Sequence, residues 1–191
     1  MRKPYKVLFL LSILLAFSGC IVASLNPLYD SDKELVSNPA LVGTWASDDK
    51  ETFTFVENGQ NQYECTITSD SISNNFDVHL VKLGKYQFLD LYPKELDEKQ
   101  MAMNLYYRMH TVPVHSFSKI SIKNDRLYVS MLNLDWTKKL IEQKKIKIPY
   151  TESNGIIVLT GPSKQLQKFV LQYADDTEAF EIPTDGMKRI K

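Results

Sequence analysis

Cysteine is scarce in this chain, with only Cys20 and Cys65 among 191 residues. Two cysteines exclude a framework of several disulfides, and no cysteine cluster with the spacing of a structural zinc site is present. Cys65 alternates with Tyr63 and Ile67 in an extended pattern, which favours a buried apolar position for its thiol.

The chain also has no excess of positive or negative charge, since 23 basic residues balance 23 acidic ones. Because no basic stripe is available to contact phosphates, we expect no nucleic-acid partner. Only seven glycines occur, and neither a phosphate-binding loop nor a Gly-x-Ser-x-Gly nucleophile elbow is found. We therefore expect a protein that is not an enzyme and needs no cofactor.

No apolar run is long enough to cross a bilayer, which takes about 20 residues. The longest, from Val7 to Phe17, follows the basic residues Arg2, Lys3 and Lys6. A positive start, a short apolar run and small residues after it are typical of a cleaved signal peptide.

The residues after this run, Ser18-Gly19-Cys20, resemble the lipobox of bacterial lipoproteins, apart from Phe17 where that family usually has an aliphatic residue. The resemblance implies that residues 1–19 are removed and that Cys20 is acylated and anchors the chain in a membrane of the cell envelope. Since the usual inner-membrane retention signal is Asp at the place of Ile21, it also favours the periplasmic face of the outer membrane in a Gram-negative organism. An acylated Cys20 leaves Cys65 without a disulfide partner.

The mature chain is long enough for one domain with a single core. We expect a lipidated tether over residues 20–40, because Asn26-Pro27 and Asn38-Pro39 interrupt regular structure there. Residues 41–191 would then form the domain.

From Leu41 onward the hydrophobic pattern has a period of two, which predicts β-strands. Turn signals at Asn58-Gly59 and Gly84-Lys85 divide it into hairpins, and Pro113 indicates an edge or a bulge. We predict one continuous antiparallel meander from Gly43 to Leu132. Its expected strands are Lys50–Val56, Gln62–Thr68, Phe76–Leu83, Tyr86–Tyr92, Leu105–Ile122 and Arg126–Leu132.

Helical spacing replaces this pattern twice near the C-terminus and predicts amphipathic helices at about Asp135–Lys145 and Ser163–Ala174. Asn133 or Asp135 can cap the first helix, and Ile156–Leu159 is a further strand between the two. The predicted fold is mainly β: an antiparallel meander curled into a barrel or half-barrel, with two C-terminal helices.

Gly43-Thr44-Trp45 resembles the Gly-x-Trp signature of lipocalins, in which the tryptophan closes one end of a barrel. A second resemblance, to a family of uncharacterised bacterial lipoproteins with a lipocalin-like domain, covers most of the mature chain. It implies a fold and a location but no established activity. Its residues are Asn26-Pro-Leu-Tyr29, His79-Leu-Val-Lys-Leu-Gly84, Phe88-Leu-Asp-Leu-Tyr-Pro93 and Pro113-Val-His115.

A two-residue turn at Gly84-Lys85 fixes the register of its hairpin and places His79 opposite Asp90. Both faces of this hairpin are largely apolar, so one must face the interior and the other must be covered by a helix, the tether or a ligand. The His79–Asp90 pair is an ordinary polar pair, an anchor in a cavity, or a titrating group. If the pair is buried, Asp90 should raise the pKa of His79 unless desolvation prevails.

Two functional hypotheses follow. In the first, a barrel cavity near His79, Asp90, Trp45, Phe88 and Tyr92 binds a lipid or another apolar small molecule. In the second, the core is filled and the outer surface docks an envelope protein. A metal site formed by His79, His110 and His115 is a weaker alternative, because His110 and His115 fall on opposite faces of a strand unless a bulge intervenes.

Overall fold

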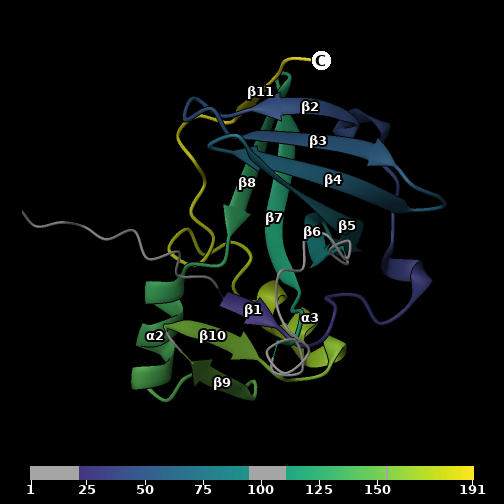
Figure 1. The fold of residues 1–191 in the computed structure, drawn as a ribbon. Coiled ribbons are helices and arrows are strands. Elements are labelled where there is room, and N and C mark those ends of the chain that lie inside the picture. The colour runs from purple at the N-terminus through teal and green to yellow at the C-terminus, as the bar shows by residue number, and fades with distance from the viewer. Residues whose placement is uncertain (1–21, 95–110, 154) are drawn as a thin grey trace, which may run out of the picture.

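The computed structural model describes residues 22–94, 111–153 and 155–191. Eight of its strands close into an antiparallel barrel in the order β11-β2-β3-β4-β5-β6-β7-β8, with β8 pairing back onto β11 (Figure 1). The strands are β2 (Gly43–Ala46), β3 (Thr52–Glu57), β4 (Gln62–Ser69), β5 (Ile72–Leu83), β6 (Tyr86–Pro93), β7 (Ser116–Lys123), β8 (Arg126–Met131) and β11 (Met187–Arg189).

The predicted meander is confirmed, because each strand from β2 to β8 pairs antiparallel with the next. The expected strand Leu105–Ile122 was too long in its described part, because β7 begins only at Ser116, after Pro113; its first six residues, 105–110, lie outside the described residues. The alternation of apolar residues sends one face of every strand into the barrel. Closure comes from β11, whose three residues carry no period-two pattern that the sequence could reveal.

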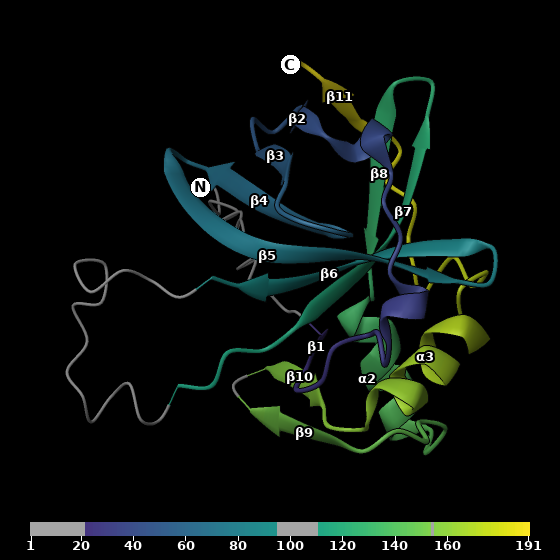
Figure 2. The same cartoon turned by 90° about the vertical axis from the view of Figure 1, so that its right-hand side faces the viewer.

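The remaining elements form a lobe beside the barrel (Figure 2). Its sheet has the order β1-β10-β9, with β1 (Val22–Ser24) parallel to β10 (Ile156–Leu159) and β9 (Tyr150–Ser153) antiparallel to it. Helices α2 (Leu134–Glu142) and α3 (Ser163–Gln172) confirm the two predicted helices. Asn133 caps α2 by accepting a hydrogen bond from the backbone N–H of Trp136 at 3.0 Å.

The predicted tether is wrong for its described part, because residues 22–41 are folded into the structure. Val22 and Ala23 are buried in the lobe sheet, and Leu28 and Leu41 are fully buried. Two 3₁₀ turns, Asp32–Glu34 and Pro39–Leu41, lie between them. The apolar side chains of this segment pack into the hydrophobic cores, and this burial keeps the segment folded. The Asn-Pro pairs gave no sign of that packing.

Two hydrophobic cores result. One fills the barrel and includes Trp45, Phe55, Tyr63 and Cys65. The other lies between the barrel wall and the lobe, where Val81, Phe88 and Phe117 of the wall meet α2, α3 and Phe180. Within the described residues, no helix has both the length and the apolar character needed to cross a membrane.

Candidate functional site

The β5–β6 hairpin has the register that its turn predicts. Gly84 takes a φ of +60°, which suits glycine in a tight turn, and Leu83 pairs with Tyr86. His79 therefore pairs with Asp90, as expected. Both faces of the hairpin are buried, and the segment after β1 and the helices of the lobe cover the outer one.

Asp90 is the most deeply buried carboxylate of the described residues, with 1% of its surface exposed. Its Oδ2 accepts a hydrogen bond from the backbone N–H of Leu28 at 2.5 Å. Its Oδ1 lies 2.6 Å from Nδ1 of His115. Both oxygens are thus engaged, which a buried carboxylate requires.

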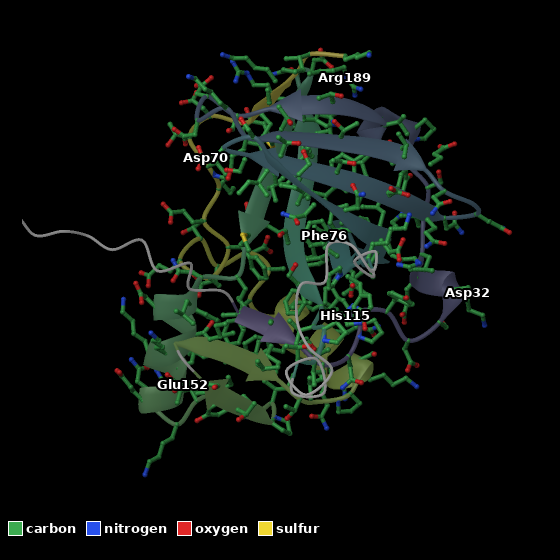
Figure 3. The ribbon with its side chains drawn as sticks, in the orientation of Figure 1. Asp32, Asp70, Phe76, His115, Glu152 and Arg189 are labelled. Atoms are coloured by element: carbon green, nitrogen blue, oxygen red, sulfur yellow. The ribbon has the colours of Figure 1, made fainter. Side chains whose placement is uncertain are left out.

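His115 stands just before β7, where the barrel meets the lobe (Figure 3). Its backbone N–H and C=O form a two-bond bridge to Ser24 of β1, at 2.8 and 2.9 Å. The ring of Tyr92 packs against its imidazole, with 4.6 Å between the ring centroids. His115 is therefore fixed on three sides: by β1, by Asp90 and by Tyr92.

His79 does not take the role expected of it. Its partner across the strand binds His115 and Leu28 instead, and the imidazole packs against Tyr29, with 4.7 Å between centroids. Burial lowers the pKa of His79, and this effect outweighs the opposing attraction of Asp90. A raised pKa was expected for His79 unless desolvation prevailed, and desolvation does prevail here. Burial, with the charge of Asp90 adding to it, also raises the pKa of Tyr29.

These contacts join three parts of the chain. We call Asp90, His115 and Leu28 the latch: a carboxylate on β6, an imidazole before β7 and an amide of the N-terminal segment. The latch is built from groups far apart in the sequence, and all of them hold the segment that follows Cys20 onto the barrel wall. Its chemistry is that of a structural clamp.

The five residues proposed to line one cavity do not all lie on the same side of the barrel wall. Trp45 is inside the barrel, where its indole N–H donates to the carbonyl of Leu41 at 2.9 Å. Phe88 is on the outer face, packed against Phe180. His79, Asp90 and Tyr92 share that outer face by alternation along β5 and β6.

The barrel interior is packed by its own side chains. Trp45, Phe55 and Tyr63 are the largest, each with at most 1% of its surface exposed. The guanidinium of Arg189 lies over the indole of Trp45, 4.1 Å from the ring centroid, and closes this end as a cation–π contact. The resemblance to lipocalins implied a tryptophan in this position.

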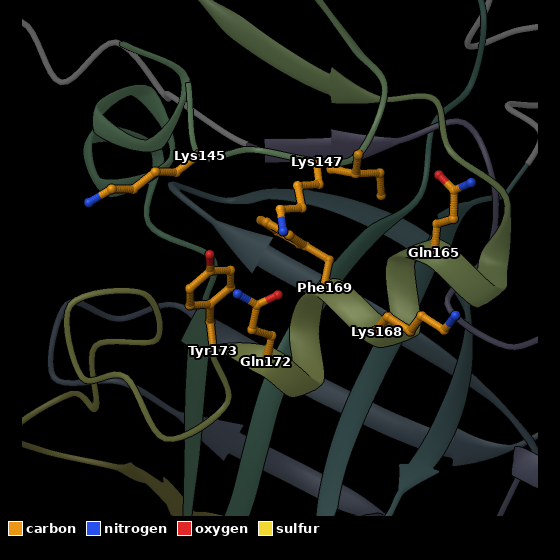
Figure 4. Close-up of a pocket in the computed structure, with 8 residues that line it drawn as sticks. Lys145, Lys147, Gln165, Lys168, Phe169, Gln172 and Tyr173 are labelled. Carbon is orange, nitrogen blue, oxygen red and sulfur yellow. The ribbon is translucent and has the colours of Figure 1, made fainter. Parts of the chain in front are cut away.

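Two hollows have several lysines in their lining. A groove of about 510 Å³ runs along β7 and the β5–β6 turn, and its charged lining is Lys82, Lys85, Lys119 and Lys123. A smaller hollow of about 210 Å³ lies between α3 and the chain from Lys145 to Ile148 (Figure 4).

The geometry gives no support to a metal site formed by His79, His110 and His115. His110 lies outside the described residues, and within them no group of three His, Cys, Asp or Glu side chains is placed to hold an ion. The sequence suggests only this metal-binding role for His115, although a carboxylate in the middle of a strand, such as Asp90, needs hydrogen-bond partners, and that need is the signal that could identify His115 as one of them. Nothing in the sequence pointed to the amide of Leu28.

Comparison with known proteins found no family model that matches the chain, no similar curated protein and no similar solved structure.

Proposed function

We propose that this protein is a lipoprotein of the bacterial cell envelope, anchored by acylated Cys20, that acts through its outer surface as an interaction module. In this proposal the barrel is a packed scaffold and does not enclose a ligand. The observation that carries it is the packing of the barrel interior together with the latch on the barrel wall.

The packed interior favours the surface over an enclosed ligand. A carrier keeps a cavity of roughly 300–1,000 Å³ for a drug-sized ligand. Here Trp45, Phe55 and Tyr63 fill the corresponding space near β2, β3 and β4. The hollow beside α3 lies in the lobe, outside the barrel.

The latch favours a body held close to its anchor. Only Ile21 separates Cys20 from β1, and β1 is bonded to β10 on one side and to His115 on the other. Leu28 then binds Asp90 on the barrel. A lipid on Cys20 would therefore hold both lobe and barrel directly at the bilayer, without a flexible spacer.

Lipid attachment to Cys20 is the test of this proposal. We expect mass spectrometry of the membrane fraction to find an N-terminal Cys20 carrying acyl chains, and Cys20→Ser to abolish incorporation of labelled fatty acid. Cys65→Ser serves as the matched control and should incorporate label normally, because Cys65 is buried in the barrel. Label in the Cys20→Ser protein, or an unmodified wild type, would refute the anchor.

A second candidate, the apolar-ligand carrier, is favoured by one specific observation. Phe53, Ile67 and Phe76 lie on the face of their strands that leads into the barrel, but they are only partly buried, and Ile72 beyond them is 65% exposed. This apolar mouth suits an acyl chain.

Lipids that copurify with the protein distinguish the two candidates. A carrier should yield stoichiometric bound lipid in mass spectrometry, lost in Phe76→Lys and kept in Val56→Lys, whose side chain is exposed on the opposite face of the wall. A scaffold should yield none.

A further inference from the structure

The charges of this protein are divided between its two parts. Residues 134–172, which supply most of the lobe, contain seven lysines and three carboxylates. The other described residues contain 17 carboxylates and only 11 lysines and arginines. The net charge of the chain is therefore near zero because a basic lobe is combined with an acidic remainder of the molecule.

Most lysines of the lobe have no carboxylate partner. Lys164 pairs with Asp30 at 3.2 Å, and no ion pair is formed by the other six within the part of the chain that the structure describes. Those six are Lys138, Lys139, Lys144, Lys145, Lys147 and Lys168. Their positive charge is available to an external anion.

Three of these lysines border the hollow beside α3. Its floor is apolar and comes from Ile148, Phe169 and Tyr173. Lys147 leans across Phe169, whereas Lys145 and Lys168 extend outward on either side (Figure 4). Exposed apolar side chains add to this character on the same lobe, with Leu171 40% and Tyr150 38% exposed.

The size of the hollow decides what it can hold. At about 210 Å³ it is smaller than the roughly 300–1,000 Å³ of sites that enclose a small ligand. It suits a phosphate headgroup with its first carbons, while the acyl chains stay outside. A cationic rim around an apolar floor is what a bilayer surface of anionic phospholipid complements.

The position of the proposed anchor also favours a membrane surface as the partner of the lobe. Residue 22 begins β1, the strand of the lobe sheet nearest in sequence to Cys20, and β1 pairs directly with β10. The basic lobe is thus the part of the molecule closest along the chain to the proposed lipid.

We propose that the lysine-rich face of the lobe, around Lys145, Lys147 and Lys168, docks on the anionic phospholipid headgroups of the membrane that holds the anchor. This inference rests on the proposed anchoring for its biological setting, but its test does not need the lipid. Docking fixes the orientation of the barrel on the membrane as well as its distance from it.

Vesicle partitioning tests the inference in full-length Cys20→Ser protein, which cannot be acylated at that residue. Partition coefficients are measured by lipid titration with phosphatidylcholine vesicles and with vesicles that also contain phosphatidylglycerol. One variant adds Lys145→Gln, Lys147→Gln and Lys168→Gln. The matched control adds Lys50→Gln, Lys82→Gln and Lys123→Gln, which removes the same charge outside the lobe. Residues 1–19 are common to all three proteins, so their contribution cancels.

We expect a clear preference for phosphatidylglycerol that weakens as salt shortens the Debye length. Each lysine near the surface is worth about fivefold in partitioning, so the lobe variant should bind up to roughly 100-fold more weakly, and the control variant much less so. In a second measurement, acetylation of Lys147 should be slowed by phosphatidylglycerol vesicles, whereas acetylation of Lys82 should not.

Equal partitioning into both kinds of vesicle overturns the inference. An equal loss in the control variant overturns it as well, because the effect would then be one of net charge. Absence of acyl chains on wild-type Cys20 would instead refute the anchor and leave the vesicle result unaffected.

Discussion

Removing the carboxylate of the latch is the sharpest test of how the fold holds the N-terminal segment. Asp90→Ala leaves the amide of Leu28 and the imidazole of His115 without their shared acceptor in a buried place. Breaking one partner of a buried charged pair costs about 3–5 kcal/mol, against a total stability of roughly 5–15 kcal/mol for a domain. Asp90→Asn should cost less, about 1–3 kcal/mol, because its oxygen can still accept from Leu28.

Urea unfolding followed by tryptophan fluorescence measures these losses, since both tryptophans are buried. Asp49→Asn, an exposed carboxylate, is the matched control and should change the unfolding free energy by less than about 0.5 kcal/mol. Hydrogen exchange adds a local measurement. The amide of Leu28 should exchange much faster in Asp90→Ala than in wild type, because its acceptor is gone.

A double-mutant cycle with His115→Ala isolates the pair, and we expect a coupling of about 1.5–3 kcal/mol. Unchanged unfolding midpoints in Asp90→Ala, or an unchanged exchange rate at Leu28, would refute the latch. A coupling near zero would show that Asp90 acts through Leu28 alone.

Three further predictions concern single positions. Because burial lowers the pKa of His79, the unfolded chain binds more protons than the folded one as pH falls through about 6.5. The unfolding free energy should therefore drop between about pH 8 and pH 5.5, and less steeply in His79→Gln. Burial raises the pKa of Cys65 to about 12, so a thiol reagent at about pH 8 should label it only in urea; rapid labelling of the native protein would contradict this. In Gly43→Ala the new Cβ would lie 2.6 Å from the carbonyl oxygen of Lys191 at a φ of +129°, and urea unfolding should show a loss of at least about 1–3 kcal/mol.

The meander and the register of its central hairpin could be predicted because both depend on local signals. Alternation over six to twelve residues identifies strands, and a two-residue turn at Gly84 leaves only one pairing across the hairpin. The capped start of α2 at Asn133 is equally local. Even the burial of both hairpin faces followed from their apolar residues.

The partners of Asp90 could not be predicted, because they come from elsewhere in the chain. Leu28 donates from 62 positions away and His115 binds from 25 positions away. The sequence offered only the nearest cross-strand candidate, His79, and the sign of its pKa shift depended on the depth of burial, which no sequence pattern reports. Parallel pairing of β1 with β10 likewise joins segments more than 130 residues apart.

The segment from Val22 to Leu41 links every part of this molecule. Its first residues extend the sheet of the lobe, Leu28 donates to the barrel wall, and Leu41 accepts the indole N–H of Trp45 at the closed end of the barrel. A force applied at Cys20 would therefore be shared by lobe and barrel before either could separate. Since the same segment carries the proposed anchor, the latch also sets how closely the barrel is held to that anchor. Loosening the latch should therefore weaken the fold and lengthen the connection between barrel and membrane, while the covalent lipid on Cys20 stays in place.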